Sequence, residues 1–173
     1  MSEERTMEIQ SAASFLAYFE SVRARTKRVA ARIPEDRVEW APRAGAFTLG
    51  DQLRHIAATE RWMFAENAAG RPSRYPGCGV ELAEGKDGVL AYLDAMHAES
   101  AEIIGALSDE DLRRTVRTPA GTPIAAWKWL RAMVEHEAHH RGQVYLLLNL
   151  LEVPTPPIYG LTSEEVYDRS VHE

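Results

Sequence analysis

Apolar residues recur every three or four positions in four long segments of the chain, which is the spacing of amphipathic helices. In the first segment, for example, Phe15, Phe19, Val22 and Val29 lie on one helical face. No segment shows a sustained alternation of apolar and polar residues, so no strand is predicted. The four predicted helices span, approximately, residues 11–33, 48–70, 86–107 and 123–151.

Residues with special backbone preferences mark the ends of these helices. Pro34 ends the first, and Thr48 is a suitable N-cap for the second, with Asp51 in its first turn. Pro154 and the prolines after it prevent continuation of the fourth. Residues 71–88 and 115–122 are rich in turn formers and are expected to be loops. A short helical turn is expected at 163–167.

Four amphipathic helices without strands predict an all-α fold, and the simplest way to bury their apolar faces is an up-down-type four-helix bundle. We expect one domain over residues 1–173, with the bundle at about 9–153 and a C-terminal tail at 154–173. The loop at 71–88 is long for a bundle connection, and long loops of this kind are often functional or mobile.

Composition narrows the classes of function. The 173 residues carry 20 Lys and Arg against 26 Asp and Glu, and this net charge of −6 argues against a nucleic-acid-binding module. The single cysteine, Cys78, excludes an internal disulfide framework and a cysteine-rich zinc site, and no role is assigned to it. No secretory signal or membrane-spanning segment is visible, so we expect a cytoplasmic protein with no membrane partner.

Two of the six histidines form a pair on the fourth predicted helix. His136 and His140 are one turn apart and differ by about 40° around the helix axis. They share a stripe with Met133, Val144 and Leu147, so they are expected to face the core. Buried imidazoles need partners. A divalent metal ion is one possibility, and hydrogen bonds to backbone or carboxylate groups are the other.

His55 offers a third imidazole from the middle of the second helix. In a bundle, one ligand from one helix and two from another can converge in the core. Three histidines leave a coordination position open for water or substrate, which is the pattern of a catalytic metal site rather than a closed structural one.

Simpler roles are expected for the other histidines and for one pair of charged residues on the fourth helix. His139 is expected to lie outside the ligand set, behind it or at an interface, whereas His97 and His172 are expected to be ordinary, partly exposed residues. Glu137 and Arg141 have the spacing of an ion pair on the helix surface.

A zinc protease is one competing interpretation, because residues 136–140 match the pattern H-E-x-x-H, in which the glutamate is a general base. Glu152, Glu164 or Glu165 would then be the third ligand. The extended form of this motif fails, because Gln143 stands where it needs glycine. Proteases of this class also place the helix beside a sheet, and no strands are predicted here.

A ferritin-like di-iron site is a second competing interpretation. It needs two Glu-x-x-His elements and a carboxylate from each of two other helices. Glu137 to His140 matches one element, and Asp94 to His97 matches only with aspartate in place of glutamate. Glu20 and Glu60 are the available bridging carboxylates. This arrangement leaves His136 and His55 without a role, so the mononuclear site is favoured.

The segment His136-Glu137-Ala138-His139-His140-Arg141-Gly142-Gln143-Val144 resembles the HxxxHxGQ-type signature of the DinB/YfiT-like family of metalloenzymes. The lone histidine in Leu49-Gly50-Asp51-Gln52-Leu53-Arg54-His55-Ile56 resembles its second hallmark, and the step Trp40-Ala41-Pro42 is similar too. The resemblance covers residues from about 10 to 165.

The resemblance implies a four-helix bundle that holds one divalent metal ion with His55, His136 and His140. Similar proteins include S-transferases and isomerases that depend on bacillithiol, mycothiol or glutathione, and others regarded as metal-dependent hydrolases. The resemblance also implies a homodimer. The small residues Ala138 and Gly142 would permit close approach of a second chain. The resemblance identifies no catalytic acid or base, and Glu137 and His139 keep no assigned role.

An open metal position supports two reactions on a small-molecule substrate. A bound thiol loses its proton readily, and a bound water becomes a nucleophile. The favoured interpretation is an S-transferase that uses a low-molecular-weight thiol and one Zn²⁺ or Ni²⁺ ion per chain. The alternatives are a metal-dependent hydrolase and a non-catalytic metal-binding module for stress response or interaction.

Overall fold

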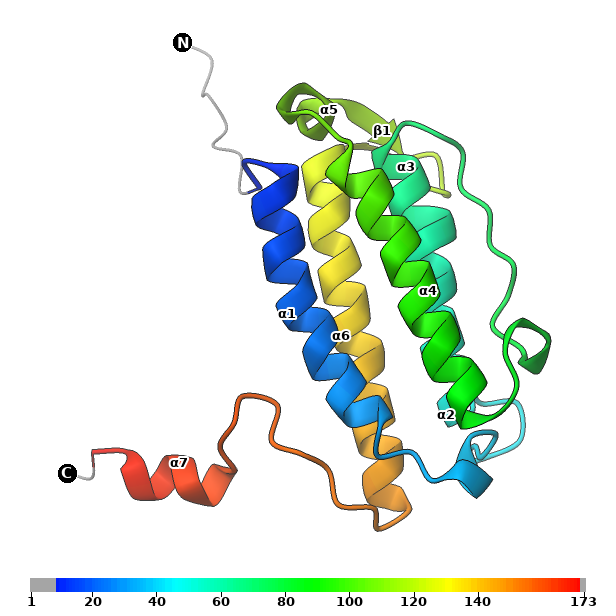
Figure 1. Cartoon of the computed structure of the whole chain (residues 1–173), viewed down its shortest axis with the longest axis vertical. Helices are drawn as coiled ribbons and strands as arrows, with labels where there is room; N and C mark the ends of the chain where they lie inside the picture. Colours follow the sequence, from blue (N-terminus) through cyan, green and yellow to red (C-terminus); the bar gives the residue numbers. More distant parts are fainter. Residues whose placement is uncertain (1–8, 172–173) are drawn as a thin grey trace.

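A computed structural model describes residues 9–171 as a bundle of four long helices (Figure 1). They are α1 (Ala12–Ala30), α2 (Leu49–Thr59) with its continuation, α4 (Gly85–Gly105) and α6 (Ala126–Leu150). The predicted all-α four-helix bundle is therefore confirmed. His172 lies outside the described residues.

The helices do not alternate in direction as an up-down arrangement would require. Contacts between Arg61 and Glu99 and between Glu60 and His97 show that α2 and α4 run parallel, while α1 and α6 run together in the opposite sense. The long loop after α3 (Glu66–Ala68) makes this possible, because it returns along the whole bundle before α4 begins (Figure 1).

The second predicted helix is one continuous column with a change of geometry in its middle. Its N-terminus is the predicted one: Thr48 Oγ1 accepts a hydrogen bond from the Asp51 amide at 2.9 Å, and Asp51 reciprocates in a capping box. After Thr59 the chain forms a π-helical segment, Glu60–Ala65, and then α3. A π segment alters which residues face the core, and such segments occur frequently at functional sites.

The returning loop is fixed to α2 by a fully buried arginine. Arg54, 0% exposed, donates to the carbonyl oxygens of Ala83 at 2.9 Å and Cys78 at 3.1 Å. It also pairs with Glu39 and with Asp51, the latter at 2.8 Å. A short 3₁₀ turn, η3 (Val80–Leu82), lies between these anchor points. The loop is therefore held in a defined position by its hydrogen bonds to Arg54.

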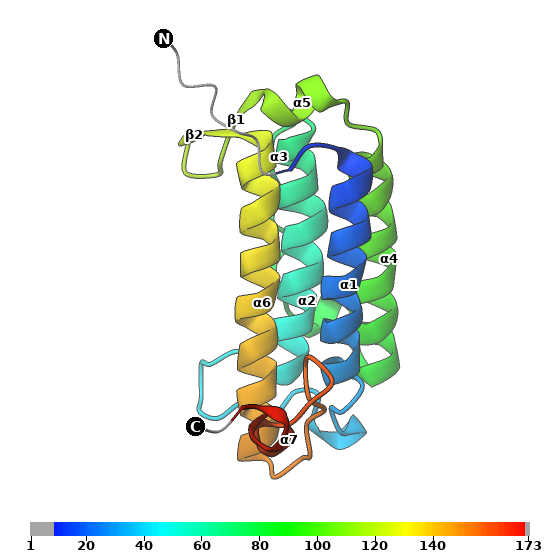
Figure 2. The same cartoon turned by 90° about the vertical axis from the view of Figure 1, so that its left-hand side faces the viewer.

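A small β-hairpin corrects the sequence prediction near residue 120. Strands β1 (Thr115–Arg117) and β2 (Pro123–Ala125) pair antiparallel, so α6 begins at Ala126 rather than at 123. Three-residue strands are too short to show an alternating pattern, which is why the sequence did not predict them. The hairpin covers one end of the bundle beside α3 and the short helix α5 (Asp109–Arg113) (Figure 2).

The C-terminal tail contains the predicted helical turn as a longer helix, α7 (Ser163–Arg169), which projects from the bundle (Figure 1). A second 3₁₀ turn, η1 (Glu35–Arg37), follows α1. Within residues 9–171, no helix combines the length and the apolar character that crossing a membrane requires.

Two apolar clusters fill the bundle, one around Leu53, Leu93 and Val144 and the other around Phe19, Phe64 and Leu130. Between them, each long helix contributes buried polar side chains at the same height. We call this set the polar layer; its members are Arg23, Thr26, Thr59, Glu60, His97, Ser100, Glu137 and Arg141.

Ionic contacts connect the polar layer across three helices. The Arg23 guanidinium pairs with Glu60, and it lies 2.9 Å from Oε2 of Glu137. Thr26 Oγ1 donates to Oε1 of Glu137 at 2.6 Å. Burial raises the pKa of Glu137, and the opposing charge of Arg23 only partly offsets this effect. The charges of Arg23, Glu60 and Glu137 thus have opposite-charge partners on other helices, as burial requires.

Glu137 and Arg141 do not form the predicted surface pair. Glu137 is 2% exposed and turns toward α1, while Arg141 is 8% exposed and its Nη1 donates to the Val22 carbonyl oxygen at 3.5 Å. The reason is that α6 contacts both α1 and α2, so two of its faces are covered. The helical spacing alone did not show which neighbour covers the second face.

His97 is also more buried than predicted. It is 8% exposed, and its ring nitrogens contact carboxylates on both sides: Glu60 Oε1 at 2.8 Å from Nδ1 and Glu20 Oε1 at 2.9 Å from Nε2. Burial lowers its pKa, and Arg23 adds to this, but the hydrogen bonds and charge of Glu60, with Glu20, outweigh both, so the net pKa is raised.

The raised pKa of His97 predicts a pH dependence of folding stability. A histidine whose pKa is higher in the folded state stabilises it fully below the unfolded value of about 6.5. That contribution is lost as the pH rises through the folded pKa. We expect urea unfolding of the parent to show this loss as the pH rises above about 6.5, and the variant His97→Gln to lack it. His139→Gln, a change at an exposed histidine that contacts no carboxylate, is the control and should behave as the parent.

Candidate metal centre

Helices α2 and α6 bring three histidines together at the height of the polar layer. His55 of α2 faces His136 and His140 of α6, and one nitrogen from each ring lies within 4.8 Å of the others. The Nε2 atoms of His55 and His136 are 3.1 Å apart. The ring centroids of His55 and His136 lie 4.5 and 4.4 Å from that of His140. The three predicted residues therefore converge.

Neighbouring side chains hold two of these rings by their outer nitrogen. Nδ1 of His140 contacts Oε1 of Gln52 at 2.7 Å and Oε1 of Gln143 at 3.0 Å. Both oxygens are acceptors, so Nδ1 carries the proton and Nε2 keeps a free lone pair. Nδ1 of His55 lies 2.6 Å from the Tyr75 hydroxyl. Hydrogen bonds of this kind fix the tautomer and orientation of metal-binding histidines.

The electrostatics of the cluster keep all three rings neutral. Burial, followed by the charges of His140, His55 and His139, lowers the pKa of His136 to about 3. Burial, with His55 and His139, lowers the pKa of His140 to about 4, and burial lowers the pKa of His55. Neutral imidazole is the form that binds a metal ion, so at neutral pH no proton has to be displaced. The donor set therefore fits a divalent ion.

His139 lies outside this cluster. Its side chain is exposed, and its Nε2 contacts the Gln143 side-chain amide at 3.0 Å. It thus reaches the cluster indirectly, through the same glutamine that contacts His140. Among residues 9–171, His55, His136 and His140 are the one group of three that can hold a metal ion.

A cavity of about 290 Å³ opens beside His55 and His136. Its other lining residues are Thr59, Met63, Ser73, Arg74, Tyr75 and Pro119. No carboxylate is among these eight residues, and the Met63, Pro119 and Tyr75 side chains make the walls largely apolar. A small organic molecule that enters this cavity meets the face of the histidine cluster.

The loop after α3 supplies Ser73, Arg74 and Tyr75 to the cavity, and sequence reasoning did not single out these residues. The Arg74 amide donates to the Trp62 carbonyl oxygen at 2.8 Å, and the Arg74 guanidinium lies 4.5 Å from the Trp62 ring centroid. The length of this loop was the one available signal, because long loops are often functional. Which of its residues reach the site depends on contacts distant in sequence.

The two competing metal interpretations do not fit the geometry. The zinc-protease pattern needs Glu137 as a base beside the ligands, but Glu137 turns to Arg23 and Thr26 of α1. For the di-iron site, Arg23 lies between Glu60 and Glu137 and pairs with both carboxylates. Arginine in that place excludes a pair of cations by charge repulsion.

Sequence comparison identifies the family. A profile of the DinB superfamily matches residues 18–144, which include the three histidines. The chain belongs to the DinB superfamily. A search of the curated proteins gave no match to this chain.

Solved structures of DinB-like proteins have the same fold. One from Bacillus cereus superposes with a TM-score of 0.72 at 16% identity, covering 86% of this chain and 97% of its own. A DinB-like protein from Bacillus subtilis gives 0.67 at 17% identity, covering 86% and 99%. YfiT from Bacillus subtilis gives 0.68 at 16% identity, covering 89% and 95%. YfiT is described as a probable metal-dependent hydrolase with an unusual four-helix bundle topology.

Proposed function

We propose that this protein is a metal-dependent enzyme whose one divalent ion is bound by His55, His136 and His140. The observation that carries the proposal is the convergence of three neutral imidazoles, two of which, His55 and His136, line an apolar cavity. Zn²⁺ and Ni²⁺ are the favoured ions, because imidazole suits both. Three protein ligands leave a position for a substrate atom, and the cavity lies beside them.

The reaction we favour is transfer of a low-molecular-weight thiol to an electrophilic carbon. A divalent ion at this site would stabilise the thiolate form of the thiol. The chain's own residues have defined tasks: Gln52 and Tyr75 orient His140 and His55, while Met63 and Pro119 help to exclude water. In the overall reaction the thiol proton passes to solvent, an S–C bond forms and the leaving group departs with its electron pair.

The absence of a carboxylate from the cavity lining supports a thiol over water as the nucleophile. Hydrolysis by a metal-activated water is commonly assisted by a nearby general base, as in the H-E-x-x-H proteases. Glu137, the acidic neighbour of His136, is engaged with Arg23 and Thr26. A thiol is far more acidic than water to begin with and needs no such base.

A metal-dependent hydrolase is the second candidate, and the structural similarity to YfiT favours it. The fold and the three-histidine cluster are compatible with an activated water at the open position. A metal-binding module without turnover is the third candidate. The cavity beside the histidines supports an enzyme over this third possibility.

We further propose that the protein is a homodimer. Leu146 and Leu150 are each 58% exposed and lie one turn apart on α6. Gly142, one turn earlier, has nothing within 4 Å of the position that a Cβ atom would occupy. These three positions form a narrow, exposed, largely apolar stripe on α6. Packing of this stripe against the same stripe of a second chain, related by a two-fold axis, would bury both.

Metal binding is tested by single substitutions. Replacing His55, His136 or His140 with Ala should weaken Zn²⁺ binding by more than the roughly 10–100-fold that loss of an outer hydrogen-bond partner costs. His139→Ala should retain the ion, and a chelator competition assay measures the difference. Saturating metal should also stabilise the parent by about 2.7 kcal/mol when free metal is 100 times its dissociation constant. Retention of one equivalent of zinc by all three ligand variants would contradict the site.

The reaction is tested with the zinc- or nickel-loaded protein, monochlorobimane as electrophile, and glutathione or cysteine as thiol. We expect protein-dependent formation of the thioether with release of chloride, and its loss in His136→Ala but not in His139→Ala. Hydrolysis of p-nitrophenyl acetate without added thiol, in the absence of thioether formation, would instead identify the hydrolase. Failure of both reactions with metal bound would favour the non-catalytic module.

The assembly is tested by sedimentation at micromolar concentration, where we expect the mass of two chains. Leu146→Glu should shift the protein to the monomer, because a charge would then be buried at the contact. Tyr18→Glu places the same charge on an exposed residue of α1 and should leave the dimer intact. A parent protein that sediments as a monomer would contradict the proposal.

A further inference from the structure

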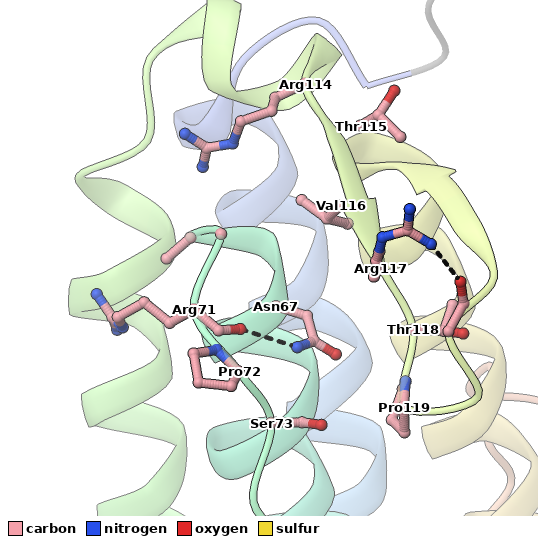
Figure 3. Close-up of a pocket in the computed structure, with 13 residues that line it drawn as sticks. Asn67, Arg71, Pro72, Ser73, Arg114, Thr115, Val116, Arg117, Thr118 and Pro119 are labelled. Carbon is pink, nitrogen blue, oxygen red and sulfur yellow. Dashed lines mark hydrogen bonds between the residues drawn. The ribbon is translucent and has the colours of Figure 1, made fainter.

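A second, larger cavity adjoins the one beside the histidines. It measures about 600 Å³ and lies between the loop that follows α3 and the β1–β2 hairpin (Figure 3). Ser73 and Pro119 line both cavities, so the two share a wall. A molecule that fills both would extend from the histidine cluster to the hairpin.

The lining of this second cavity is basic, in a chain whose net charge is −6. Three arginines, Arg71, Arg114 and Arg117, are among its residues, and no carboxylate is. Two of the three have acidic partners elsewhere: Arg71 pairs with Glu66, and Arg114 lies 2.9 Å from Asp111. Figure 3 shows the Arg71 side chain directed away from the hairpin.

Arg117 is the arginine that remains for a ligand. Its Nη1 donates to the Gly121 carbonyl oxygen at 2.9 Å, and within residues 9–171 it has no carboxylate partner. The bond to Gly121 holds the guanidinium against the hairpin turn (Figure 3). Its other N–H groups remain available, and a guanidinium presents them in a planar arrangement that matches a carboxylate.

A buried acceptor lies on the opposite wall. Asn67 is 4% exposed, and its Nδ2 donates to the Arg71 carbonyl oxygen at 2.9 Å. Its Oδ1 is buried and has no hydrogen-bond partner. In Figure 3 this oxygen is directed to the side of the cavity where Arg117 lies. A buried acceptor without a partner is costly, and a donor from a bound molecule would satisfy it.

We propose that this cavity binds the charged end of the substrate, and that the charged group is a carboxylate next to an amine or hydroxyl donor. Arg117 would bind the carboxylate, and Oδ1 of Asn67 would accept from the neighbouring donor. This inference builds on the proposed function, because it assigns the thiol cosubstrate to the carboxylate-bearing class. Thiols without a carboxylate would leave the free N–H groups of Arg117 without a ligand acceptor and bind more weakly.

The test uses a probe that has the charged ends but no free thiol. S-Methylglutathione carries two carboxylates and an ammonium group, and its dimethyl ester lacks the carboxylates. By calorimetry at low salt, we expect the parent to bind the acid at least about tenfold more tightly than the ester, because hydrogen bonds between a guanidinium and a carboxylate are stronger than those to a neutral ester. Arg117→Gln should lose this preference.

Two control variants test whether the preference for the acid depends on the metal site or on the overall positive charge. Arg113→Gln removes a positive charge from an exposed residue that does not line the cavity, and it should bind the acid as the parent does. His136→Ala should keep the preference for the acid, because binding at Arg117 does not require the ion. Equal binding of acid and ester by the parent, or an unchanged preference in Arg117→Gln, would overturn the proposal.

The outcomes also distinguish this inference from the proposed reaction. Arg117-dependent binding of S-methylglutathione without thioether formation from any thiol would support the cavity and reject the transferase. Thioether formation at equal rates with glutathione and with cysteamine, which has no carboxylate, would support the transferase and reject the cavity as a determinant of thiol choice.

Discussion

The compensation of buried charge in the middle of the bundle is the constraint on which the rest of the structure depends. Arg23, Glu60 and Glu137 come from three different helices, and each is almost fully buried. A displacement of one helix along its axis by a single turn would leave a charge without a partner in the core, which is strongly unfavourable. The polar layer therefore sets the heights of α1, α2 and α6 relative to one another, and so the height at which His55 meets His136 and His140.

The long loop between α3 and α4 has two roles. It allows α2 and α4 to run parallel, and on its way along the bundle it closes the cavity beside the histidines. Arg54 holds its second half, and the Arg74 backbone holds its first half against Trp62. The same loop thus allows the parallel course of the two helices and forms one wall of the cavity. The residues that shape access to the histidines therefore lie on a connection between helices.

Local features of the fold and of the site were readable from the sequence. The apolar spacing predicted the four helices, and Thr48 as N-cap, with Asp51 in the first turn, predicted the start of α2 to within a residue. The i,i+4 spacing of His136 and His140 placed both on one face, because the geometry of a helix fixes that relation without reference to neighbours. The choice of His55 as their companion depended on its place in the middle of another helix, and the structure brings the three together.

Tertiary structure alone decided which elements meet and in what direction. Glu137, Arg141 and His97 looked like surface residues because helical periodicity reports the main apolar face and does not report a second covered face. The parallel course of α2 and α4 and the three-residue strands β1 and β2 carry no periodic signal at all. The sequence by itself determined the helices and the histidine pair, which depend on neighbouring residues. The partners of the buried charges, the cavity walls and the orientation of Asn67 and Arg117 depend on residues brought together only by packing.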